Sequence, residues 1–86
     1  MENQKTIDVI KAIKETLISE IEQGITVTKA ELERIDELIK EDGYDIALRY
    51  ADEVKELKCK LHFMDVTKRR IKDTFSDFIY DLNHSN

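Results

Sequence analysis

The residue types best suited to chemistry lie in the second half of the chain. Cys59 and His62 are three residues apart, so one turn of helix would bring a thiol beside an imidazole. A catalytic thiolate needs a neighbouring base and a lowered pKa, and no Cys-His-Asn pattern follows. Cys and His often occur three or four residues apart by chance, so this spacing alone does not indicate a catalytic site. We therefore predict none at this pair.

A row of acidic residues near the C-terminus could supply metal ligands. Asp73, Asp77 and Asp81 are four residues apart, and His84 follows three residues later. Carboxylates and an imidazole on one helical face could hold a divalent ion. Aspartates at this spacing are also typical of the hydrated side of an amphipathic helix, which is the interpretation we prefer. The sequence therefore predicts no metal site, no cofactor and no enzymatic activity.

A basic block is the third candidate. Residues 57–72 carry a net charge of +5 in a chain whose total is −5. The residues that could bind an anion are Lys58, His62, Arg69, Arg70 and Lys72. On a helix most of them share one side, as in nucleic-acid-binding surfaces, although Arg70 points elsewhere. Such surfaces usually add stacking aromatics, and the one aromatic nearby, Phe63, is expected in the core. Nucleic-acid binding is therefore the alternative; we prefer pairing of the block with acidic residues of the chain.

Composition indicates that helices position these residues. The chain has 86 residues, of which 41% are hydrophobic and 38% charged, with two Gly and no Pro. These values favour one all-α domain over residues 1–86. The chain has a single cysteine, no signal-peptide pattern and no apolar run approaching the roughly 18 residues of a membrane span. We therefore expect a cytoplasmic protein that does not enter a membrane.

Apolar spacing predicts helices over approximately 6–23, 28–41, 44–64 and 65–83, the last two possible as one continuous helix. Gly24 is a suitable residue to follow the first helix, and Ile25 to Thr28 would form a connector. Thr28 and Glu31 fit a capping box that would begin the second helix. Asp42 and Gly43 would end it.

From residue 44 onward, one apolar stripe repeats at spacings of three and four. Its members are Ala47, Tyr50, Val54, Leu57, Leu61, Met64, Lys68, Ile71, Phe75, Phe78 and Leu82. A continuous helix is preferred, with a kink near 64–67 or a short strand as the alternatives. As one helix the stripe would span about 54 Å, against about 20–27 Å for each earlier helix. The sequence thus predicts a three- or four-helix bundle with a long C-terminal amphipathic helix, and a homodimer that covers the excess length.

The last part of the stripe is the predicted interface. It comprises Lys68, Ile71, Phe75, Phe78 and Leu82. Lys68 is the one charged member, and it could either fix the register of a coiled coil or extend its ammonium group to solvent. We prefer the second interpretation.

The function predicted from these features is contact with another protein. The sequence suggests a small helical regulator or inhibitor, of the kind that phages and mobile elements encode, with nucleic-acid binding through the basic block as the alternative.

Overall fold

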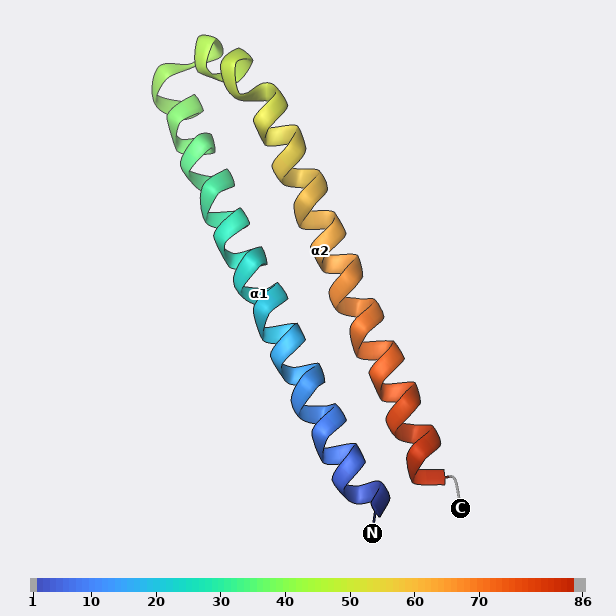
Figure 1. Ribbon diagram of the computed structural model, residues 1–86. Helices are drawn as coiled ribbons and strands as arrows, with labels where there is room; N and C mark the ends of the chain where they lie inside the picture. Colours follow the sequence, from blue (N-terminus) through green and yellow to red (C-terminus); the bar gives the residue numbers. More distant parts are fainter. Residues whose placement is uncertain (1, 85–86) are drawn as a thin grey trace.

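The computed structural model describes residues 2–84, which form two helices of 41 residues each, α1 (Glu2–Asp42) and α2 (Tyr44–His84). The helices run antiparallel along each other and form a hairpin whose outer ends lie together (Figure 1). The all-α prediction is confirmed. The prediction of a three- or four-helix bundle is wrong, because the segments expected as separate helices are joined into two long ones.

A single glycine makes the turn. Gly43 has a φ of +78°, and its amide donates to the Ile39 carbonyl at 2.8 Å. Its own carbonyl accepts a hydrogen bond from the Ala47 amide at 3.2 Å and so begins α2. Residues with a side chain rarely adopt this backbone conformation. The expectation that α1 ends at Asp42 and Gly43 is confirmed.

On each helix, two columns of residues form the contact between α1 and α2, and the residues within a column are seven positions apart. On α1 the buried or half-buried columns are Ile7, Lys14, Ile21, Thr28 and Ile35, and Ile10, Leu17, Gly24, Glu31 and Leu38. On α2 they are Ala47, Val54, Leu61, Lys68, Phe75 and Leu82, and Tyr50, Leu57, Met64, Ile71 and Phe78, of which only Phe78 is exposed. This is the heptad pattern of an antiparallel coiled coil. The predicted stripe therefore faces α1.

The middle of α1 corrects the predicted break between 23 and 28. Gly24 is not a helix end, and the helix continues through Ile25 to Thr28. Thr28 is buried, and its hydroxyl donates to the Gly24 carbonyl at 2.8 Å, so it does not cap a new helix. Glu31 instead binds the Arg34 guanidinium at 2.8 Å, which raises the pKa of Arg34.

Packing against α2 explains why α1 tolerates a glycine in its interior. A Cβ added at Gly24 would lie 3.0 Å from the Met64 sulfur. A glycine there costs about 1 kcal/mol in helix propensity relative to alanine, but it lets a long side chain cross the interface.

The two glycines should respond to alanine with opposite signs. We expect Gly43→Ala to destabilise the protein by about 1 kcal/mol, because of its positive φ. Gly24→Ala should stabilise it by up to about 1 kcal/mol, since the flexible end of Met64 can move away and helix propensity improves. Urea unfolding at one protein concentration measures both. Destabilisation by Gly24→Ala would show that Met64 cannot move.

The second helix is continuous. α2 runs from Tyr44 to His84 without a break near 64–67 and without a strand at Leu57 to Phe63. Because α1 has the same length as α2, the length mismatch that motivated a dimer does not exist.

The hairpin leaves most of its surface exposed. It measures 64 × 15 × 12 Å, and its radius of gyration is 19.3 Å, against about 12 Å for a compact domain of this length. Within residues 3–84 the buried residues are Ile7, Thr28 and Ile35. The accessible surface is 6881 Å², whereas a compact monomer of 10.1 kDa would have about 5,300 Å².

Candidate interaction surfaces

The five residues of the predicted interface differ in how much surface they offer. Lys68, Ile71, Phe75 and Leu82 are half-buried along the side of α2 that faces α1. Phe78 is 52% exposed. Contact of this segment with a partner stays a prediction, and Phe78 is the member with the most surface left to bury.

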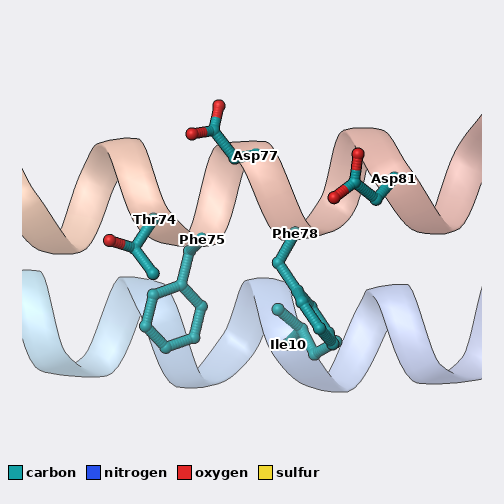
Figure 2. Close-up of a pocket in the computed structure, with 6 residues that line it drawn as sticks. All are labelled: Ile10, Thr74, Phe75, Asp77, Phe78 and Asp81. Atoms are coloured by element: carbon teal, nitrogen blue, oxygen red, sulfur yellow. The ribbon is translucent and has the colours of Figure 1, made fainter.

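A groove of about 400 Å³ surrounds Phe78 near the open end of the hairpin, the end opposite the Gly43 turn. Its lining residues are Ile10, Thr74, Phe75, Asp77, Phe78 and Asp81. In Figure 2 the Phe75 and Phe78 rings extend towards α1 and the Phe78 ring lies over Ile10, while Asp77 points away from α1. We call this set the open-end groove: an apolar floor with two carboxylates beside it.

Lys68 lies inside the contact between the helices and is paired. Its Nζ is 2.9 Å from the Glu22 Oε1 on α1, and the two side chains are 25% and 53% exposed respectively. The hydrogen bond from Lys68 and then its charge lower the pKa of Glu22, with a smaller contribution from Lys72. Lys68 therefore extends its ammonium to the edge of the interface, where a specific carboxylate of α1 receives it.

This ion pair predicts that the stability of the folded protein depends on pH. Because the pKa of Glu22 is lower in the folded than in the unfolded chain, its stabilisation is present above the unfolded pKa and is lost as pH falls through the folded value. We expect Glu22→Gln to lower the melting temperature at neutral pH. That difference from the wild type should shrink below the ordinary glutamate pKa of about 4.3.

A double-mutant cycle provides the control for this prediction. In a Lys68→Met background, the pH-dependent effect of Glu22→Gln should be much smaller, because the ion-pair partner of the carboxylate is gone and only the weaker contribution of Lys72 remains. An effect that is the same with and without Lys68, or the same at both pH values, would contradict the prediction.

A second column of apolar residues runs along one flank of α1. It consists of Ile18, Ile25, Leu32 and Ile39, seven residues apart and all half-buried, and we call it the flank column. Two shallow grooves lie between this column and α2. One is lined by Leu32, Glu33, Asp36, Ile39, Val54 and Lys58, and the other by Ile25, Lys29, Lys58, Leu61, His62 and Asp65. Apolar residues on both helices therefore border this flank.

The candidate anion-binding residues are divided by acidic neighbours. Lys58 and His62 line one of these grooves together with Asp65. Arg69 and Lys72 line a separate hollow with Lys68 and the same Asp65, whose carboxylate is 3.8 Å from Arg69. Arg70 is exposed and lines neither hollow. The other four candidates, together with Asp65, thus form a mixed-charge edge along α2.

The remaining candidates for chemistry are dispersed. Cys59 is exposed. The His84 ring stacks on Tyr80 with centroids 4.0 Å apart, and its Nδ1 donates to the Tyr80 carbonyl at 2.8 Å. Among residues 2–84, no three His, Cys, Asp or Glu side chains are close enough together to share a metal ion, so Asp73, Asp77 and Asp81 form no such group.

Neither described helix has a stretch long and apolar enough to cross a membrane.

Sequence reasoning missed the flank column, although its signal is present. In the predicted arrangement Ile18 belongs to the helix over 6–23, whereas Leu32 and Ile39 belong to a separate helix over 28–41. A seven-residue spacing that continues from Ile18 through Ile25 would have joined them, but the expected break at Gly24 separated the two segments.

Comparison of the chain with protein-family models, with curated proteins and with solved structures gives no match.

Proposed function

We propose that this protein is a non-enzymatic regulator or inhibitor that acts by binding another protein through its open-end groove. The observation that carries the proposal is Phe78, which continues the heptad pattern of α2 yet keeps half of its surface exposed. Exposed apolar residues grouped in a groove with polar neighbours are typical of protein-binding sites.

The charges around the groove define the partner. Asp77 and Asp81 line it, and residues 73–86 carry a net charge of −3. An apolar floor beside carboxylates suits an amphipathic helix that presents an apolar anchor flanked by lysine or arginine. The partner is therefore a protein with an exposed basic amphipathic segment.

Two exposed phenylalanines allow a matched test. Phe78 lies in the groove, whereas Phe63 is 70% exposed near the middle of α2 and does not line it. Wild type, Phe78→Ala and Phe63→Ala would each be used to capture proteins from a lysate of the source organism. Each captured protein would then be purified and its affinity for the three forms measured.

The proposal predicts a partner whose affinity falls at least tenfold with Phe78→Ala and less than twofold with Phe63→Ala, since buried aromatic anchors dominate such interfaces. Replacing Asp77 and Asp81 with asparagine should weaken binding and reduce its salt dependence. A purified partner that binds all three forms equally, or the absence of any protein that distinguishes them, would refute the proposed site.

A further inference from the structure

We propose that the flank column is the interface with a second copy of this chain, so that two hairpins form a dimer of four helices. This inference is independent of the proposed function, because it concerns the other flank of the hairpin. Ile25 lines a groove with Leu61, whereas Val27, two residues along α1, lies in a hollow away from α2.

The first argument is the amount of surface. The hairpin exposes about 1,600 Å² more than a compact chain of its mass. Obligate dimers bury roughly 1,000–2,500 Å² per chain, so pairing along one flank would remove an excess of the right size. A core of three buried residues within 3–84 is small for a stable 86-residue chain, and short chains often gain burial by association.

The second argument is the regularity of the column. Ile18, Ile25, Leu32 and Ile39 are half-buried although they lie outside the heptad columns that contact α2. Four aliphatic residues at a strict spacing of seven form a straight ridge about 32 Å long. A ridge of this length fits another long, straight helix, which each copy of the hairpin provides.

Charge selects the orientation of the two copies. The α1 edge beside the column carries Glu15, Glu22, Lys29 and Asp36, and the α2 edge carries Lys55, Lys58, His62, Asp65, Arg69 and Lys72. The first set has a net charge of −2 and the second of +3 with His62 neutral. The flank is thus acidic along α1 and basic along α2.

Two symmetric arrangements bring this flank of two copies face to face. Rotation about the long axis of the hairpin lays α1 of each copy over α2 of the other, with both Gly43 turns at the same end. Rotation about the short axis lays α1 over α1 and α2 over α2, with the turns at opposite ends. Only the first brings acidic and basic edges together, so it is the arrangement we infer. In that dimer the open-end groove stays on the outer face.

A matched pair of substitutions tests the interface. Light scattering should give the wild type a mass of twice 10.1 kDa, and its melting temperature should rise with protein concentration. Ile25→Lys should give a monomer, or an unfolded chain at concentrations where the wild type is folded. Val27→Lys, at an exposed site two residues away, should leave the dimer intact. A monomeric wild type with a concentration-independent melting temperature would overturn the proposal, as would an Ile25→Lys dimer of unchanged affinity.

Spin labels test the orientation. Asp45→Cys in a Cys59→Ser background places one label beside each turn. With both turns at the same end, adjacent helices are about 10 Å apart and the label-to-label distance should stay below about 30 Å. A distance near the 64 Å length of the hairpin would overturn the inferred arrangement.

Discussion

Replacing Val27 with proline is expected to destabilise the protein by about 3 kcal/mol or more. Val27 lies in the interior of α1 and its side chain is 67% exposed, so the change affects the backbone rather than the core. Proline there removes the amide that would donate to the carbonyl of Gln23, and its ring clashes with that carbonyl. Denaturant unfolding followed by far-UV circular dichroism would measure the loss.

This prediction distinguishes the observed helix from the connector that local sequence signals suggest. If residues 25–28 joined two helices, proline at 27 would be tolerated, because connectors readily accommodate it. Val27→Ala is the control, and it should change stability by no more than about 0.5 kcal/mol because the site is exposed. A Val27→Pro protein as stable as Val27→Ala would mean that α1 is interrupted.

Local signals identified the helical class and the turn but not the length of α1. Gly43 follows a run of good helix formers and precedes another, so its role could be predicted from its type and position. Gly24 carries the same local signal, and the β-branched residues after it favour a break. What overrides them is packing along the whole helix, since the repeat of Ile21, Thr28 and Ile35 continues in phase. Local helix propensity depends on a few neighbouring residues, whereas the stabilisation from packing against α2 accumulates over five heptads.

The residues that make up the candidate surfaces could be predicted from the sequence, but how far each of them is exposed could not. The stripe on α2 was identified from spacing alone, and ten of its eleven members are half-buried. Sequence could not show that Phe78 would be left out, because that depends on which residues of α1 lie opposite it. Likewise, Lys68 was recognised as the charged member, but Glu22 as its partner follows only from the register of the hairpin.

Truncating Ile35 to alanine is expected to cost about 3 kcal/mol. Ile35 is fully buried, with 0% of its surface exposed. Removing a buried isoleucine side chain typically costs 2–5 kcal/mol through lost transfer energy and the cavity left behind. Ile13→Ala is the control, since Ile13 is 47% exposed and its truncation should cost less than about 1 kcal/mol. Equal losses at the two positions would mean that the Ile35 site is not part of a packed core.

The same measurement at Ile25 distinguishes the isolated hairpin from the dimer. In the hairpin alone Ile25 is half-buried, so Ile25→Ala should cost well under the loss at Ile35. In a dimer that covers the flank column, Ile25 would enter a core of four helices and its truncation should cost nearly as much as that of Ile35. This dimeric contribution must also grow with protein concentration, because stability is then coupled to association. A loss at Ile25 that equals the loss at Ile13 at every concentration would mean that no second copy covers the column.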